Sequence, residues 1–277
     1  MNFKIVTDSS ADILKLSNIP FESAPLKIIT SQNEYVDNAD LDVRLMVDEL
    51  GKYKGKSSTS CPNPSDWLDT FGNAERVFCV TITGTLSGSF NAAISAKKVY
   101  EEMYPERRVF VLDSLTAGPE MYLIIEKIKE LILENPDFDK ICDSITQYCN
   151  QTGLIFMLES MKNLSNNGRV SPLVAKMAGL LGIRVVGKAS SKGDLEPINK
   201  CRGEEKALQT ILEHLKEQGL KNGKVRIAHC FNETAAQKLK DLIEKELNNV
   251  NVKIYNCRGL CSFYAEKGGM LIGYEKF

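Results

Sequence analysis

The stretch VFCVTITGTLSGSFNAAISAKKVYEEM, residues 77–103, decides the fold. Its first seven residues are apolar or β-branched, which predicts a strand. A turn of glycine and hydroxyl residues follows, and residues 88–103 have helical character. A strand, a short polar turn and a helix in this order are typical of a parallel sheet.

The same order recurs in the first half of the chain. Further strands are predicted at residues 3–7, 26–30 and 108–112, and another helix at residues 118–133. Repetition of strand and helix predicts a largely parallel sheet covered by helices on both faces.

The second half repeats this alternation. Strands are predicted at residues 154–158, 184–186, 225–229, 252–255 and 270–274. Residues 204–219 contain an apolar stripe at helical spacing, which predicts an amphipathic helix that Gly219 ends. The stripe consists of Leu208, Ile211, Leu212 and Leu215. Residues 232–247 repeat the pattern, with Asn232 placed to cap the helix.

These patterns predict an α/β protein of two domains, and 277 residues exceed one typical domain. We expect residues 1–150 to form an N-terminal α/β domain with a mostly parallel sheet flanked by helices. We expect residues 151–277 to form a C-terminal α/β domain with a mixed sheet and helices. Periodicity sets this boundary, because no linker rich in Pro, Gly or Ser marks it.

Charge and hydropathy exclude several classes of partner. The 35 Lys and Arg residues nearly balance the 36 Asp and Glu residues, so no net field attracts a nucleic acid or an anionic membrane. Neither a secretory signal nor an apolar run of about 18 residues is visible, so we expect a cytoplasmic protein without stable membrane insertion. A small molecule or a protein is the expected partner.

Eight scattered cysteines indicate free thiols in a reducing compartment. Cys257 and Cys261 lie close together, but without a second cysteine pair or a nearby histidine they are a poor zinc signature. We therefore expect no metal site.

Hydroxyl-rich turns follow the predicted strands at residues 7–10, 83–89 and 113–116, and another at residues 57–64 precedes a helix. Such turns gather at the carboxyl edge of a parallel sheet, where helix amides favour an anion. The alternative is that each hydroxyl or carboxylate caps a helix, and we favour it for Asp8 and Asp113. For residues 84–89 both interpretations stay open, because two glycines and several hydroxyls exceed what one cap needs.

The sequence does not support the enzyme classes that its motifs suggest. Residues 182–189 resemble a phosphate-binding loop, but their interior is β-branched and Ala189 replaces the metal-binding hydroxyl. Asp8 lacks the second carboxylate of a phosphoryl-accepting site. His214 and His229 lack a nucleophile motif, and we expect them on a solvated helix face and at a strand end. No catalytic residue and no cofactor are predicted.

The hydroxyl turns belong to a series of motifs that resembles the DegV family along almost the whole chain. The motifs, in order, are Lys4-Ile-Val-Thr-Asp8-Ser9-Ser10-Ala-Asp12, Ala24-Pro25-Leu26, Thr59-Ser60-Cys61-Pro62-Asn63-Pro64, Leu86-Ser87-Gly88-Ser89-Phe90-Asn91-Ala92-Ala93, Val111-Leu112-Asp113-Ser114, Gly168-Arg169-Val170-Ser171, and Lys200-Cys201-Arg202-Gly203 followed by Lys206-Ala207-Leu208. Each motif is weak alone, and their shared order carries the resemblance.

The resemblance implies two α/β domains that hold one long-chain fatty acid, with the carboxylate near the domain junction and the acyl chain in an apolar tunnel. Thr59 and Ser87 would hydrogen-bond the carboxylate, supported by Ser60 and the amides around Gly88. Arg169 would order the pocket or meet a transferring phosphoryl group, with a structural salt bridge as its alternative role. Some members are the lipid-presenting subunit of a kinase system, so the resemblance implies an ATP-dependent fatty acid kinase as a second partner.

The chain departs from the family pattern near its end. Carrier members have a histidine in a Thr-His-Thr-Gly-Pro-Gly stretch, and residues 262–268 stand in its place. Tyr264 falls near the histidine position and would donate one hydrogen bond. This departure bears on the kinase partner more than on lipid binding.

The sequence leaves two alternative functions open. A phosphate-dependent transferase would use the same turns for a phosphorylated substrate and would have a wide polar cleft. An interaction module would hold its lipid only as filler. A tunnel lined by apolar side chains favours the lipid-binding protein.

Overall fold

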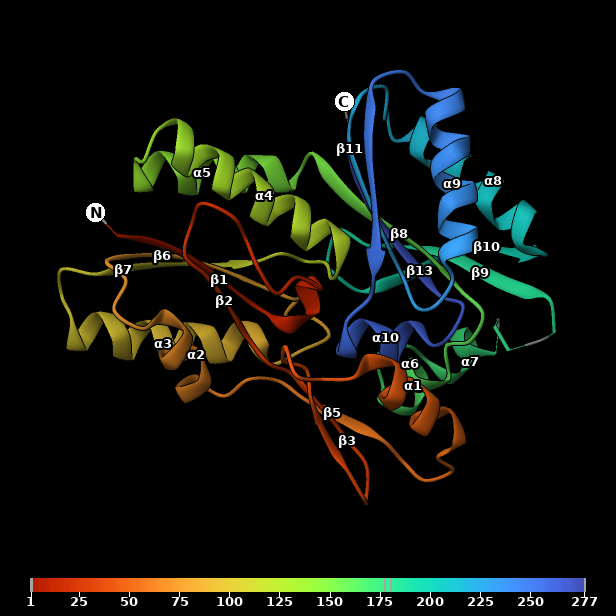
Figure 1. Cartoon of the computed structure of the whole chain (residues 1–277), viewed down its shortest axis with the longest axis horizontal. Coiled ribbons are helices and arrows are strands. Elements are labelled where there is room, and N and C mark those ends of the chain that lie inside the picture. The colour runs from red at the N-terminus through yellow and green to blue at the C-terminus, as the bar shows by residue number, and fades with distance from the viewer. Residues whose placement is uncertain (1, 177, 180, 277) are drawn as a thin grey trace.

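A computed structural model describes residues 2–176, 178–179 and 181–276 (Figure 1). Its strands are β1 (Phe3–Asp8), β2 (Phe21–Ala24), β3 (Lys27–Ile29), β4 (Glu34–Val36), β5 (Ser58–Ser60), β6 (Arg76–Thr81), β7 (Arg108–Asp113), β8 (Thr152–Leu158), β9 (Ile183–Ala189), β10 (Leu195–Arg202), β11 (Gly223–His229), β12 (Val250–Asn256) and β13 (Met270–Glu275). Its helices are η1 (Ser9–Ala11), α1 (Val43–Lys52), α2 (Pro64–Phe71), α3 (Ser89–Met103), α4 (Pro119–Glu134), α5 (Phe138–Cys149), α6 (Lys162–Asn166), α7 (Pro172–Ala175), α8 (Glu204–Glu217), α9 (Glu233–Glu246) and α10 (Gly259–Ala265).

The first sheet has the order β2-β1-β6-β7, and all its neighbouring strands are parallel. Alternate residues of β6 point to opposite faces. Phe78 and Val80 pack with α4 and α5, whereas Val77 and Cys79 pack with α2 and α3. Figure 1 shows these helix pairs on the two sides of the sheet. The predicted parallel sheet, flanked by helices, is confirmed.

A separate antiparallel sheet has the order β4-β3-β5. The strand predicted at residues 26–30 is observed as β3 (Lys27–Ile29), but it belongs to this small sheet and not to the parallel one. The reason is a tight turn, in which the Thr30 amide donates to the Asn33 carbonyl at 2.9 Å. A turn this short joins only antiparallel strands. On the other side of β3, Thr59 of β5 lies opposite Ile28.

The second sheet has the order β10-β9-β8-β13-β11-β12, in which only the β11–β12 pair is parallel. The predicted mixed sheet is therefore confirmed. Helices α8 and α9 cover one face, and the predicted stripe of α8 is buried there. Gly219 follows α8 with a φ of 90°, as a helix-ending glycine does. Asn232 does precede α9, but its side chain donates to the Gly268 carbonyl rather than capping the helix.

Residues 183–189 form strand β9, so the similarity to a phosphate-binding loop is coincidental. His214 does not lie on a solvated helix face. It is buried between α8 and the second sheet, with Nε2 3.1 Å from the Tyr274 hydroxyl, and burial lowers its pKa.

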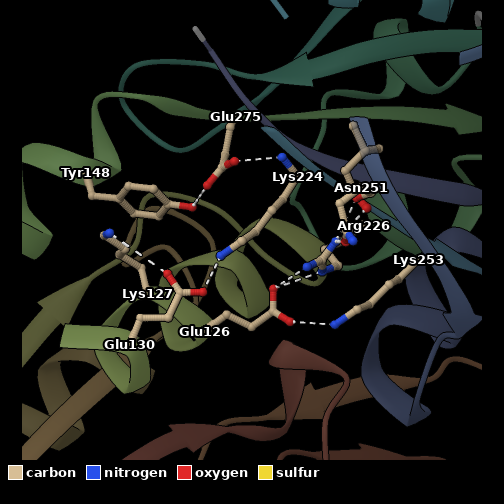
Figure 2. Close-up of polar contacts among 10 residues, drawn as sticks. Glu126, Lys127, Glu130, Tyr148, Lys224, Arg226, Asn251, Lys253 and Glu275 are labelled. Carbon is tan, nitrogen blue, oxygen red and sulfur yellow. Dashed lines mark hydrogen bonds and ion pairs between the residues drawn. The ribbon is translucent and has the colours of Figure 1, made fainter. Parts of the chain in front are cut away.

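Helix α4 packs on strands of both large sheets. Charged side chains join it to the second sheet (Figure 2). Glu126 accepts from the buried Arg226, with 2.7 Å between Nη2 and Oε2, and pairs with Lys253 at 3.1 Å. Glu130 pairs with Lys224. We call this set of residues the α4 junction.

Helix α10 joins the halves at a second place, although its residues come from the end of the chain. Both oxygens of the buried Asp37 accept main-chain amides, from Gly259 at 2.9 Å and from Leu260 at 2.8 Å. Asp12 accepts the amide of Arg258 at 2.7 Å. We call these contacts the α10 junction. Because helices cross between the two sheets, the domain boundary near residue 151 stays a prediction.

Candidate functional site

The turn after β6 is held by the buried carboxyl group of Asp8. Asp8 accepts the Ile82 amide at 2.9 Å and the Ser89 hydroxyl at 2.6 Å, besides the Ser10 amide that it caps at the start of η1. Burial raises its pKa, and the hydrogen bonds oppose that rise. Asp8 thus caps η1, as predicted, and its hydrogen bond with Ser89 also positions the start of α3.

We predicted that Asp113 caps a helix, but the structure shows that it does not. Its carboxylate accepts the amides of Gly84 and Leu115, at 3.1 Å each from Oδ1. The helix that follows, α4, starts after Gly118 instead. Asp113 therefore fixes the position of Gly84 in the β6–α3 turn.

The hydroxyls of the β6–α3 turn exceed the needs of helix capping. Gly88 occupies the N-cap position of α3 and supplies no side chain. Ser87 Oγ accepts the Ser89 amide at 3.3 Å, and a hydroxyl that accepts one bond still has a proton to donate. A Cβ on Gly88 would lie 3.1 Å from Cys61 Sγ, so this position favours glycine.

Thr59, Tyr264 and Arg169 meet beside this turn, although they come from distant parts of the chain. The Thr59 and Tyr264 hydroxyls lie 2.7 Å apart. The Arg169 guanidinium lies 6.0 Å from the centre of the Tyr264 ring, within cation–π range. Burial raises the pKa of Tyr264, while Thr59 and the charge of Arg169 lower it, so the phenol stays protonated near neutral pH.

Arg169 forms no carboxylate ion pair within the described ranges of the chain. Its guanidinium donates instead to the carbonyls of Leu86, at 3.2 Å, and of Asn167. The alternative role as a structural salt bridge is thus not seen among these residues. Arg169 ties the segment after α6 to the β6–α3 turn, and no acid among the residues of described position pairs with its charge.

These residues surround one cavity of about 360 Å³, within the usual range of roughly 300–1,000 Å³ for small-molecule sites. Its polar lining includes all six residues singled out from the sequence, Thr59, Ser60, Ser87, Gly88, Arg169 and Tyr264. The structure therefore brings the candidate residues together, and their roles as ligands stay a prediction. Arg169, Thr59, Ser87 and Tyr264 are half-buried, while Ser60 and Gly88 are exposed.

The rest of the lining is mostly apolar. It comes from both halves of the molecule and consists of Leu26, Ile82, Leu86, Ala117, Leu154, Phe156, Leu158, Leu164, Leu195, Leu260, Ala265 and Leu271, with Cys61 and Cys261. Strand β8 contributes every second residue from Leu154 to Leu158, which is one face of the strand. The cavity thus joins a polar mouth to an aliphatic interior.

Sequence reasoning missed both cysteines and the aliphatic lining. Cys61 stands inside the motif of residues 59–64, so its neighbours were a signal. Burial raises the pKa of its thiol. The lining leucines carry no local signal, because a leucine that faces a cavity has the same pattern as one in a core. No cluster of three or more His, Cys, Asp or Glu side chains suited to a metal occurs among the residues with described positions.

A family model described as an uncharacterised protein of the DegV family matches residues 2–276. The chain belongs to the DegV family. A DegV domain-containing protein of Streptococcus gordonii is 40% identical over 279 residues, which covers 99% of each chain.

Two solved DegV-like structures have nearly the same fold. A DegV family protein from Eubacterium eligens, loaded with heptadecanoic acid, is 42% identical with a TM-score of 0.98 and covers 99% of this chain and 100% of its own. The Streptococcus pneumoniae fatty acid kinase (Fak) B3 protein, loaded with linoleic acid, is 41% identical with a TM-score of 0.98 and covers 100% of both chains. In the described part of the chain, no helix has the length and apolar character needed to span a bilayer.

Proposed function

We propose that this protein binds one long-chain fatty acid, with the acyl chain in the aliphatic interior of the cavity and the carboxylate at its polar mouth. Thr59 and Ser87 donate hydrogen bonds to the carboxylate, and Ser60 and the amides around Gly88 support them. The observation that carries this proposal is a single cavity that joins a leucine-rich interior to these hydroxyls. The fatty acids in the two similar structures support it.

The acyl chain supplies most of the affinity. Each buried methylene contributes about 0.8 kcal/mol, so the roughly fourteen methylenes of a palmitoyl chain offer on the order of 11 kcal/mol before ordering losses. A rival transferase would bind a phosphorylated substrate in a wide polar cleft. The aliphatic lining of this cavity favours the lipid.

The carboxylate needs partners because its desolvation costs several kcal/mol. Hydroxyls and main-chain amides at the start of α3 compensate this loss without a metal. Arg169 adds a positive charge at the same mouth while its own hydrogen bonds hold the turn. The site is therefore suited to an acidic head with a long apolar tail.

The polar mouth is more exposed than the interior, which suits presentation of the acid to a separate ATP-dependent kinase that forms the acyl phosphate. In this proposal the chain is the lipid-presenting subunit and does not catalyse the reaction itself. Arg169 then faces the transferring phosphoryl group, and Tyr264 stands where carrier members have a histidine. We expect Arg169→Ala to retain lipid but to lose acyl-phosphate formation with a cognate kinase.

Native mass spectrometry before and after organic extraction tests lipid binding directly. The expected result is one fatty acid per chain before extraction and reloading of the extracted protein by palmitic or oleic acid. A protein that carries no acid and cannot be loaded would overturn the proposal.

A further inference from the structure

Phe156 is the largest side chain in the wall that β8 contributes to the cavity. Leu154, Phe156 and Leu158 all line the cavity, and at about 3.3 Å per residue this wall extends roughly 13 Å. Phe156 stands midway along it and is 2% exposed. A ring in this place limits the space through which an acyl chain can pass.

The position of the ring depends on Gly187. Phe156 and Gly187 are directly opposite each other across the β8–β9 pair, so their side-chain positions share one face of the sheet. A Cβ on Gly187 would lie 2.4 Å from Cζ and 2.7 Å from Cε2 of Phe156. The ring therefore leans over β9 and fills the place that a side chain at position 187 would take.

We propose that Phe156, seated over Gly187, determines which acyl chains the cavity accepts. This inference rests on the proposed fatty-acid binding. A methyl group at position 187 displaces the ring into the cavity and shortens the usable space. Removal of the ring extends that space and admits longer or more bent chains.

The same strand offers a matched control on its other face. A Cβ on Gly153 would lie 2.6 Å from both Cζ and the hydroxyl oxygen of Tyr274, which is opposite it on β13. Because side chains alternate along a strand, Gly153 faces away from Phe156. Tyr274 packs in the cluster under α8 and α9 and does not line the cavity. Gly153→Ala thus introduces the same kind of crowding without touching the cavity.

A competition experiment measures the selectivity. The lipid-free wild type and variants are equilibrated with an equimolar mixture of myristic, palmitic, stearic, arachidic and oleic acids, and the bound acids are extracted and quantified by mass spectrometry. One methylene is worth about fourfold in affinity. We expect Phe156→Ala to raise the ratio of arachidic to palmitic acid by about tenfold or more, and Phe156→Leu to raise it less. We expect Gly187→Ala to raise the ratio of myristic to palmitic acid by about fourfold.

The double variant decides whether Gly187 acts through the ring. A Cβ at position 187 would also lie 2.8 Å from the Glu196 carbonyl, so the single variant presses on β10 as well. In the Phe156→Ala background we expect Gly187→Ala to cause no further shift toward myristic acid, and Gly153→Ala to retain the wild-type profile. If Gly187→Ala does not fold, the two Phe156 variants decide the question.

The outcomes separate this inference from the function on which it rests. A lipid-loaded wild type with unchanged profiles in both Phe156 variants overturns the inference alone. A shift that persists when Gly187→Ala is made in the Phe156→Ala background overturns the role of Gly187. A wild type that binds none of the acids overturns the proposed function and this inference with it.

Discussion

The two junctions between the halves of the molecule are built from different interactions. At the α4 junction, charged side chains face each other, with Glu126 paired to the buried Arg226 (Figure 2). At the α10 junction, main-chain amides donate to the buried carboxyl groups of Asp12 and Asp37. The α4 residues lie outside the lining of the cavity, whereas α10 carries Tyr264 and three other lining residues.

Because the two junctions differ in this way, we expect the α4 junction to contribute to stability and the α10 junction to fix the geometry of the cavity as well. An ion pair between long side chains tolerates small shifts of the elements that carry it. A carboxyl group that accepts two successive amides fixes both the first residue and the direction of a helix. We therefore expect damage to the α4 junction to lower stability alone, and damage to the α10 junction to disturb lipid binding as well.

The largest effect is expected for Glu126→Ala. It leaves Arg226 buried without its acidic partner, which costs about 3–5 kcal/mol of folding free energy. Urea unfolding of lipid-free protein measures the loss, and Glu130→Ala, which removes a more exposed pair, should cost less than about 1 kcal/mol. Any folded Glu126→Ala protein should keep wild-type lipid affinity. Loss of that affinity would contradict the expectation that the α4 junction affects stability alone.

Asp37→Ala should have the next largest effect. Two amides at the start of α10 lose their acceptor, which lowers the free energy of unfolding by about 2–3 kcal/mol. Because α10 carries Tyr264, we also expect a lower fraction of lipid-loaded protein in native mass spectra. Asp40→Ala, on the exposed segment nearby, is the control. Full lipid loading of Asp37→Ala would show that its amide contacts do not set the cavity wall.

The α10 junction should also make stability depend on pH. Burial raises the pKa of Asp12 from the ordinary value of 3.8 to about 8, so between these values the folded protein keeps a proton that the unfolded chain releases. The stabilisation is complete below the lower value and falls as pH rises toward 8.

Asp12→Asn removes this titration. Between pH 5 and pH 8 the free energy of unfolding should fall less in Asp12→Asn than in wild type. The two decreases should differ by at least about 1 kcal/mol, which is the value of one pKa unit. Urea midpoints between these two pH values provide the test, with the exposed Asp69→Asn as control. Equal slopes for Asp12→Asn and wild type would rule out Asp12 as the titrating group.

The smallest effect is expected from a variant that touches neither junction. Ser87→Ala removes one proposed hydrogen bond to the fatty-acid carboxylate and should weaken binding about tenfold, while loss of its 3.3 Å contact with the Ser89 amide should lower the free energy of unfolding by less than about 1 kcal/mol. Fatty-acid titration of the lipid-free protein measures this change, and Ser95→Ala on the exposed surface of α3 is the control. Unchanged affinity would remove Ser87 from the head-group site.

The sequence predicted those strands, turns and helices whose formation depends on residues close to them in the chain. The strand, turn and helix that include Val77 and Ser89 were recognisable because β-branched runs and hydroxyl turns depend on near neighbours. Strand β5 was missed because its sequence is polar, and its pairing with β3 depends on Ile28, which is distant along the chain. His214 was misassigned because helix periodicity alone does not show that Tyr274 covers its outer edge.

The candidate site could be predicted only in part. Thr59, Ser87 and Arg169 came from motifs shared with a family, and no spacing rule places these residues side by side. The interior of the cavity was not predicted residue by residue, because its walls converge from both halves. Phe156 illustrates the difficulty, since the role proposed for it depends on an opposite glycine in another strand.

The contact between Thr59 and Tyr264 joins residues 205 positions apart. During synthesis the ribosome releases Thr59 long before Tyr264, so a nascent chain has the turn after β6 but lacks α10. Asp12 and Asp37 then have no amides to accept, and the cavity lacks one wall. The cavity is therefore completed only after α10 has been synthesised and has packed against segments that precede it by more than 200 residues.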